Sequence, residues 1–242
     1  MSNLRADVDL SPAIRALSRQ LNLWAVASIA WGLFRLFRED FVETGFALAL
    51  VVLGVAAFYV RSPAMLPVFA VAFFWSGILS VLAFSPWWLG VGILQIFASI
   101  VILRAFRNYS HLQEHHVIDY STLENPSLRL FQATDKFPVL SATMAGAALV
   151  EVLVAVVVSV LVIVSSLDKS MDEILEIVLP YMYLAYLVEP LAVFAFALGL
   201  SSHLARQHPR VLATVGMTLG GLIMLGFIII ALIAVVGPPV LP

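Results

Sequence analysis

The sequence predicts an all-α fold, a polytopic bundle of about seven transmembrane helices with the N-terminus in the cytoplasm and the C-terminus outside. The first observation is composition, because 62% of the 242 residues are hydrophobic and 12% are charged, whereas soluble domains contain about 45–50% apolar and about 25% charged residues. The second is that the apolar residues form blocks that, at about 1.5 Å per residue, can cross about 30 Å of hydrocarbon. The third is the distribution of positive charge between these blocks.

Hydropathy places the spans in a block of four and a block of three. Residues 21–103 form the four-span block, residues 104–140 a polar cytoplasmic loop, and residues 141–242 the three-span block. The first two spans are close to the shortest length that crosses a bilayer, so six spans is the alternative. The expected spans cover residues 21–37, 46–60, 64–84, 87–103, 142–164, 177–200 and 211–236.

Residues 1–20 are polar and precede the first span. No short apolar core with a small-residue cleavage site follows them, so we expect no cleaved signal peptide. Ser11 and Pro12 have the pattern of a helix N-cap followed by proline in the first turn. Leu17 and Leu21 then fall on one face, which predicts a cytoplasmic amphipathic helix on the membrane surface before the chain turns inward. The favoured role of this segment is a simple lead-in to the bundle, and docking to the membrane or to a partner is the alternative.

Lysine and arginine are unevenly divided between the two sides of the predicted bundle. Ten of the 13 fall on the side of the N-terminus and three on the other. Because positive residues are retained on the cytoplasmic side during insertion, this bias places the N-terminus inside. The bias would almost vanish if the first segment lay in the interface, so it also favours a true first span. Arg35, inside that span, is expected to extend along its own stem to the headgroups.

The charge balance and the absence of cysteine exclude several classes of site. The chain has 13 lysine and arginine residues against 15 aspartate and glutamate residues, so nothing indicates a nucleic-acid partner. It has no cysteine, which excludes disulfides and thiolate metal ligands. It also carries no phosphate-binding loop, dinucleotide-binding glycine motif or nucleophile elbow. The sequence therefore requires no cofactor and favours a protein without enzymatic activity.

Two glutamates lie inside predicted spans. Glu151 is about 14 Å and Glu189 about 18 Å from the start of its span, so both are expected near the bilayer midplane. An intramembrane carboxylate costs about 2.5 to 3.5 kcal/mol or more and needs a partner, a proton or a role. Tyr183 and Tyr186 precede Glu189 on the same face. Pro190 frees the carbonyl of Tyr186, which offers a further ligand beside the carboxylate.

These residues support two hypotheses. In the first, they form a midplane ion or proton site to which the fourth span contributes. In the second, each carboxyl group is protonated and hydrogen-bonded to a tyrosine, which is an ordinary interhelical contact. The residues of the first hypothesis are Glu151, Glu189, Tyr183, Tyr186, Gln95 and Ser99.

Small residues at four-residue spacing predict where helices approach each other. Ala147 and Ala155 flank Glu151 on its helix, which predicts that Glu151 faces protein and not lipid. Gly216 and Gly220 form a small-x-x-x-small pattern in the last span. This pattern permits close helix packing without indicating which helix is the neighbour.

The polar loop carries the remaining candidate for chemistry. If the helix of the fourth span continues into it, His111, His115 and Asp119 repeat every four residues and share one face. That spacing can chelate a divalent metal ion. A solvated, mildly basic helix beside the membrane is the simpler interpretation, because the spacing lacks a full ligand set.

The function predicted first is that of a non-enzymatic accessory, assembly or structural subunit of a membrane complex. Its partners would be the lipid bilayer and other membrane chains or further copies of itself. The alternative is a small ion- or proton-coupled transporter or channel that uses Glu151 and Glu189, and a metal-dependent membrane enzyme is the third choice. The lack of a targeting segment favours a bacterial cytoplasmic (inner) membrane.

Overall fold

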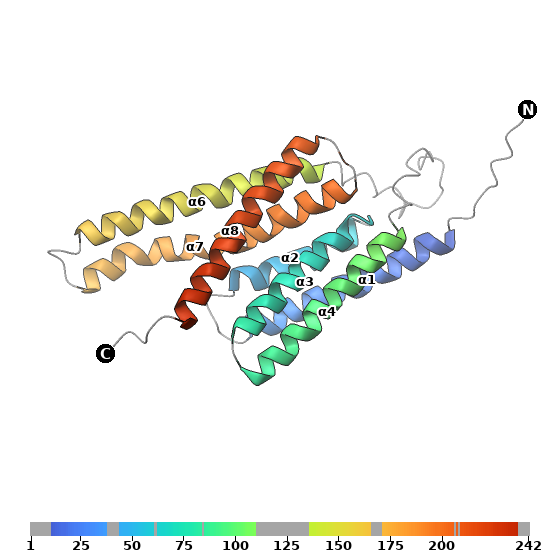
Figure 1. Ribbon diagram of the computed structural model, residues 1–242, viewed down its shortest axis with the longest axis horizontal. Coiled ribbons are helices and arrows are strands. Elements are labelled where there is room, and N and C mark those ends of the chain that lie inside the picture. Colours follow the sequence, from blue (N-terminus) through green and yellow to red (C-terminus); the bar gives the residue numbers. More distant parts are fainter. Residues whose placement is uncertain are drawn as a thin grey trace, which may run out of the picture.

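The computed structural model describes residues 11–37, 44–60, 62–83, 85–109, 136–165, 171–205, 207 and 209–236. Side chains are described for these residues apart from 11–14, 163, 165, 171–186, 231 and 233–236. The described residues form seven α-helices and no strand (Figure 1). The helices are α1 (Ser11–Leu36), α2 (Thr44–Tyr59), α3 (Met65–Leu82), α4 (Pro86–Tyr109), α6 (Phe137–Ser165), α7 (Met171–Leu204) and α8 (Arg210–Val236).

Each helix lies where a span is predicted, and five of them have the length and composition needed to cross a membrane. These five are α3, α4, α6, α8 and the part of α7 from Leu187 to Leu204. α2 is apolar but has only 16 residues, and at about 1.5 Å per residue it is shorter than about 30 Å of hydrocarbon. The all-α fold class is therefore confirmed within the described residues, and the helices indicate a membrane protein. The crossing of the membrane by α1 and α2, and the orientation of the bundle, stay predictions.

Several helices extend beyond the predicted spans. α4 continues to Tyr109 and α6 begins at Phe137, so the stretch between the two blocks is shorter than residues 104–140. α1 is continuous from Ser11 to Leu36. The residues expected to form a surface helix and those expected to form the first span therefore belong to one helix. Apolar side chains in the first half of α1, among them Leu17 and Leu21, are buried in the bundle. The position of this part of α1 at the membrane surface stays a prediction.

α3 and α7 form the centre of the bundle. α3 packs against α4 and α7, while α7 also packs against α2, α6 and α8. Most side chains of α3 are buried, among them Leu66, Phe69 and Trp75. The four-helix block α1–α4 and the three-helix block α6–α8 therefore meet along α2, α3 and α7. Figure 1 also shows that the α6–α7 hairpin extends past the four-helix block at one end of the molecule.

Glycines allow consecutive helices to approach closely. A Cβ atom added to Gly77 of α3 would lie 2.9 Å from the carbonyl oxygen of Gly92 on α4, and one added to Gly92 would lie 2.7 Å from that of Gly77. A side chain at either position would push the backbones apart, so only glycine permits this contact. Glycines also allow close contact between α1 and α2 and between α7 and α8, where an added Cβ atom would lie 2.6 Å from the carbonyl oxygen of an alanine on the neighbouring helix; these glycines are Gly32, Gly54, Gly199 and Gly220.

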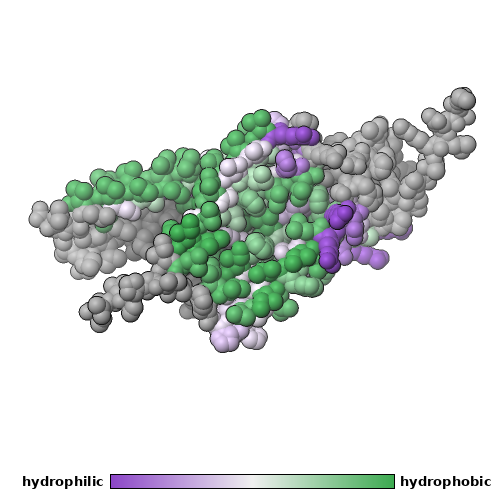
Figure 2. Space-filling model, viewed as in Figure 1, coloured by the Kyte–Doolittle hydropathy of each residue, from purple (hydrophilic) through white to green (hydrophobic). Residues whose placement is uncertain are grey.

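The surface of the bundle has the polarity of a membrane protein. Figure 2 shows that hydrophobic side chains cover most of the described surface on one face, while hydrophilic ones gather where α4 ends and α8 begins. Large apolar side chains are exposed on most of the helices. A soluble monomer rarely exposes such a continuous apolar surface, whereas a bilayer provides hydrocarbon to cover it.

Candidate functional site

Glu189 lies on α7 where this helix packs against α3. Its Oε1 accepts a hydrogen bond of 2.7 Å from Nε1 of Trp75. Trp75 is buried in the 18-residue α3, about 15 Å along the helix from Met65. A buried indole N–H needs an acceptor, and the carboxylate supplies it. The two side chains thus join the two blocks of the bundle at the middle depth of α3.

Glu151 lies on α6, which packs along α7. Oγ of Ser141 donates a hydrogen bond of 2.7 Å to the carbonyl oxygen of Ala195. This bond places Ser141 and Ala195 at the same level of the antiparallel pair. Glu151 lies ten residues after Ser141 and Glu189 six residues before Ala195, so the levels of the two glutamates differ by about four residues, which is about one helical turn or about 6 Å. Oε2 of Glu151 is enclosed by protein and forms no hydrogen bond within the described part of the chain. The two glutamates therefore lie on adjacent helices at similar depth, and Trp75 binds one of them.

The other residues of the predicted ion or proton site lie in two places. Tyr183 and Tyr186 belong to α7, and their side chains lie outside the described residues. Gln95 and Ser99 are buried on α4, in the other block. The hydroxyl of Ser99 donates to the carbonyl oxygen of Ile96 in its own helix at 2.6 Å. A single site that contains all six residues stays a prediction.

Arg35 lies inside the bundle and does not extend to the headgroups. Its side chain is only 4% exposed, its Nη2 donates to Oγ of Ser80 at 3.4 Å, and its guanidinium carbon lies 5.7 Å from the centre of the Trp31 ring. The prediction that this side chain reaches the membrane surface is therefore wrong. An aromatic face and a hydroxyl give the cation partners inside the protein, and the planar guanidinium suits stacking on an indole.

Ser80 belongs to a buried polar cluster that joins α1, α3 and α4. Its hydroxyl lies 2.9 Å from the carbonyl oxygen of Ser76 and 3.4 Å from Oε1 of Gln95. Because a hydroxyl has one hydrogen to donate, we assign it to the shorter contact. Nε1 of Trp31 donates to Oγ of Ser76 at 2.9 Å. Nε2 of Gln95 is buried and forms no hydrogen bond among the described residues.

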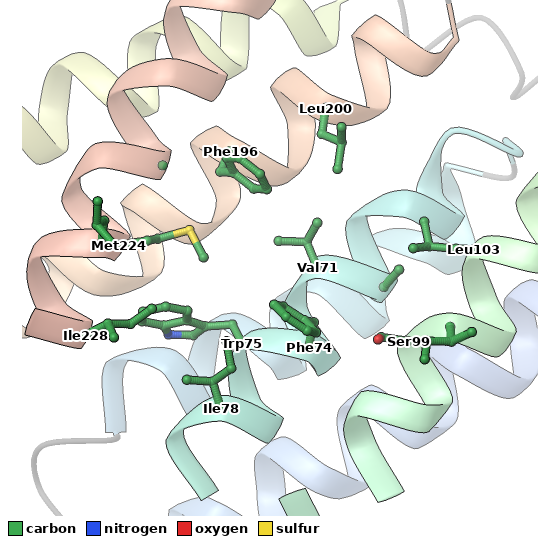
Figure 3. A pocket seen from close by; sticks show the side chains of 14 residues that line it. Val71, Phe74, Trp75, Ile78, Ser99, Leu103, Phe196, Leu200, Met224 and Ile228 are labelled. Carbon is green, nitrogen blue, oxygen red and sulfur yellow. The ribbon is translucent and has the colours of Figure 1, made fainter. Parts of the chain in front are cut away.

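An apolar cavity of about 440 Å³ lies between the two blocks, with walls from α3, α4, α7 and α8 (Figure 3). Figure 3 shows side chains of both blocks around it, with Phe196 and Met224 from one block and Val71 and Phe74 from the other. Trp75 also lines the cavity. The residue that binds Glu189 therefore forms part of the cavity wall.

Gly216 and Gly220 lie at contacts between α8 and its neighbours. A Cβ atom added to Gly216 would overlap Oγ of Ser141 on α6. One added to Gly220 would lie 2.6 Å from the carbonyl oxygen of Ala192 on α7. The two glycines of the small-x-x-x-small pattern therefore face different helices, both within the three-helix block.

The buried face of α6 contains only part of the small-residue row predicted around Glu151, which is itself half-buried. Ala147 is exposed and Ala155 is half-buried. The residues of α6 that are fully enclosed include Ser141, Ala145 and Ala148. Because successive residues turn by about 100° around a helix, Ala147 points away from the face that Ala145 and Ala148 share. The prediction of a close contact at Ala147 is therefore corrected.

The predicted metal ligands His111, His115 and Asp119 lie outside the described residues. Within the part of the chain that the structure describes, no group of three or more histidine, cysteine, aspartate or glutamate residues could hold a metal ion. Metal binding by the loop stays a prediction.

Sequence reasoning missed the role of Trp75 and the polar cluster around Arg35. A signal was present, because Trp31 and Arg35, and likewise Ser76 and Ser80, are four residues apart within apolar helices. Polar side chains at this spacing share one helix face. The pair on α1 and the pair on α3 could therefore have been predicted to face each other and to form one buried polar cluster.

The two blocks are thus joined by an indole and a carboxylate, and they enclose an apolar cavity beside this contact. The chain matches no family model, no curated protein and no solved structure.

Proposed function

We propose that this chain is a non-enzymatic subunit of a membrane complex, with an accessory, assembly or structural role. The observation that carries the proposal is an exposed apolar row along α6. Of the five helices that could cross a membrane, α6 is the least buried within the described chain. The row consists of Val150, Val154, Val157 and Leu161.

The spacing of this row is typical of a seam between packed helices. Intervals of four, three and four residues average about 3.7 per turn, close to the period of the α-helix, which keeps one side of the helix toward a partner. A hollow of about 390 Å³ opens among the row and the neighbouring Leu153 and Val158, and it offers a side chain of a second helix a place to insert. Valine is stiff at χ1, so its packing costs little side-chain entropy.

The buried polar groups support a structural role for the rest of the bundle. Trp75 and Glu189 join the two blocks, and Ser28 joins α1 to the carbonyl oxygen of Leu50 on α2 at 2.7 Å. Ser201 of α7 likewise donates to the carbonyl oxygen of Ala64, at the start of α3. Such interhelical hydrogen bonds stabilise a membrane bundle by about 0.6 to 2 kcal/mol each.

Site-specific photo-crosslinking in the native membrane tests the proposal. A photoreactive amino acid replaces Val157, which is 57% exposed on α6, or in the control Leu94, which is 68% exposed on α4. We expect Val157 to crosslink to a distinct membrane protein in stoichiometric yield, and Leu94 to crosslink to lipid. Mild detergent extraction and a native gel should show the same partner. A solitary chain on the gel and equal crosslinking at both positions would contradict the subunit role.

An ion- or proton-coupled transporter or channel is the second candidate. The observation that favours it is Oε2 of Glu151, which is enclosed by protein without a hydrogen bond among the described residues. A buried carboxylate oxygen of this kind can accept a proton or a cation. Glu151→Gln should then abolish proton or cation flux into proteoliposomes while the protein remains folded. Absence of flux in the wild-type chain would rule this candidate out.

A further inference from the structure

The cavity between the two blocks has an apolar lining. Among the side chains around it, Ser99 is the one with a hydroxyl, and this hydroxyl donates to the carbonyl oxygen of Ile96. Water occupies a cavity when it finds two to four polar partners there, and an apolar cavity stays dry. The cavity therefore suits a hydrocarbon.

The cavity opens sideways, toward the surface that hydrocarbon chains would cover. α4 packs mainly on α3, and α8 mainly on α7 and α6, so α3 and α7 form the floor while α4 and α8 form the two walls. Ile100 and Leu103 on one wall and Leu225 on the other are also exposed. A chain that lies between α4 and α8 can therefore enter from the bilayer without passing through the protein.

Arginine side chains lie beyond the cavity on both α4 and α8, at the same end of the bundle. On α4, Arg104 and Arg107 lie four residues beyond Ile100 and Leu103, on the same faces. On α8, Arg210 lies eleven residues before Gly221, which is three turns and nearly the same face. The three arginines are exposed. Figure 2 shows the hydrophilic surface gathered at this end.

The cavity lies within about the depth of one bilayer leaflet from these arginines. At about 1.5 Å per residue, Leu103 and Arg107 are about 6 Å apart along α4, and Gly221 and Arg210 about 16 Å apart along α8. A leaflet contributes about half of the 30 Å of hydrocarbon. A phosphate among the arginines would thus place its own acyl chain within reach of the cavity.

We propose that the cavity binds the acyl chain of an anionic phospholipid, with the phosphate held by the arginines at the ends of α4 and α8. The apolar lining recognises the chain, and the charge complementarity selects an anionic headgroup over a zwitterionic one. Because the lipid would contact both blocks, it would also strengthen their association. This inference is independent of the proposed subunit role.

Native mass spectrometry of the full-length chain tests the proposal. The protein is purified in mild detergent, stripped of lipid, and mixed with phosphatidylglycerol or with phosphatidylcholine of identical chains. We expect one retained lipid per chain and at least about tenfold tighter binding of phosphatidylglycerol. A wild-type chain that retains neither lipid would overturn the proposal.

Two glycines of α8 provide matched variants. Gly221 lines the cavity, and Gly226 has no atom within 4 Å of an added Cβ. Gly221→Leu should fill the cavity and weaken phosphatidylglycerol binding at least about tenfold, whereas Gly226→Leu should bind as the wild type does. Equal binding by the two variants would mean that the lipid lies elsewhere. A phosphatidylglycerol with a diazirine at the chain end covers the case in which Gly221→Leu does not fold, because it must label cavity residues such as Met224 in the wild type.

The headgroup contact is tested separately. The triple variant Arg104→Gln, Arg107→Gln and Arg210→Gln leaves the cavity intact, so it should still retain a lipid but bind phosphatidylglycerol and phosphatidylcholine about equally. An undiminished preference for phosphatidylglycerol would overturn the assignment of the phosphate to these arginines.

Discussion

Nε1 of Trp75 and Oε1 of Glu189 are joined by a hydrogen bond of 2.7 Å that crosses the boundary between the four-helix and three-helix blocks. The two residues are 114 positions apart in the chain. Each satisfies a hydrogen-bonding requirement of the other, because a buried indole needs an acceptor and an intramembrane carboxyl group needs a donor. This pair is therefore one specific contact between the two blocks, beside the hydrogen bond from Ser201 to Ala64.

Glu189→Gln should leave the stability of the bundle nearly unchanged, because the amide oxygen can still accept from Trp75. Glu189→Leu should lower the free energy of unfolding by about 1 kcal/mol, since it leaves the indole without its acceptor. Reversible unfolding in SDS, followed by tryptophan fluorescence, measures both. If the glutamine variant is destabilised as much as the leucine variant, the contact depends on the charge and not on the hydrogen bond.

Gly216→Ala should destabilise the three-helix block by about 2 kcal/mol, because overpacking a tight contact typically costs about 1 to 3 kcal/mol. The added methyl group would overlap Oγ of Ser141, which donates to the carbonyl oxygen of Ala195. Gly226→Ala is the control on the same helix, since an added Cβ there meets nothing within 4 Å. The thermal unfolding midpoints of the two variants should differ clearly. Equal midpoints would show that α6 and α8 can separate at no cost.

The positions of the helices could be predicted from the sequence because each apolar block must satisfy its own backbone hydrogen bonds in hydrocarbon. The partners of the polar residues could not, because they depend on which helices become neighbours. Arg35 illustrates this difference. Its place near the end of a span suggests a side chain that extends to the headgroups, whereas Trp31 and Ser80 hold it inside the bundle. Glu189 likewise finds its partner on α3, a helix that sequence proximity does not indicate.

Helix faces were predicted less well than helix positions for a related reason. Small residues occur on several faces of α6, and the chain alone does not indicate which face meets α7 and α8. Ala147 and Ala145 are equally small, yet Ala145 is buried and Ala147 is exposed. The glycines of α8 were more informative, because a missing Cβ is needed only where another helix approaches very closely.

A double-mutant cycle on Arg35 and Ser80 should reveal a coupling of about 0.5 to 1 kcal/mol. Arg35→Met and Ser80→Ala each remove one side of the contact between Nη2 and Oγ, so their effects on the free energy of unfolding should not add. Arg35→Lys should also be destabilising, because an ammonium group cannot stack on Trp31 as a guanidinium does. Additive effects of Arg35→Met and Ser80→Ala would mean that Arg35 stabilises the bundle through its other contacts alone.

The number of spans and their orientation can be measured with single cysteines, because the chain contains none of its own. Phe37, which is 83% exposed after the end of α1, and Asn108, which is exposed near the end of α4, are the two informative positions. If α1 and α2 both cross the membrane, the two cysteines lie on opposite sides, and the excess of arginine and lysine places Asn108 in the cytoplasm. A membrane-impermeant maleimide added to intact cells should then label Phe37→Cys at once and Asn108→Cys only after permeabilisation. Labelling of both under the same condition would mean that α2 does not cross, because α3 and α4 then return the chain to the side of Phe37.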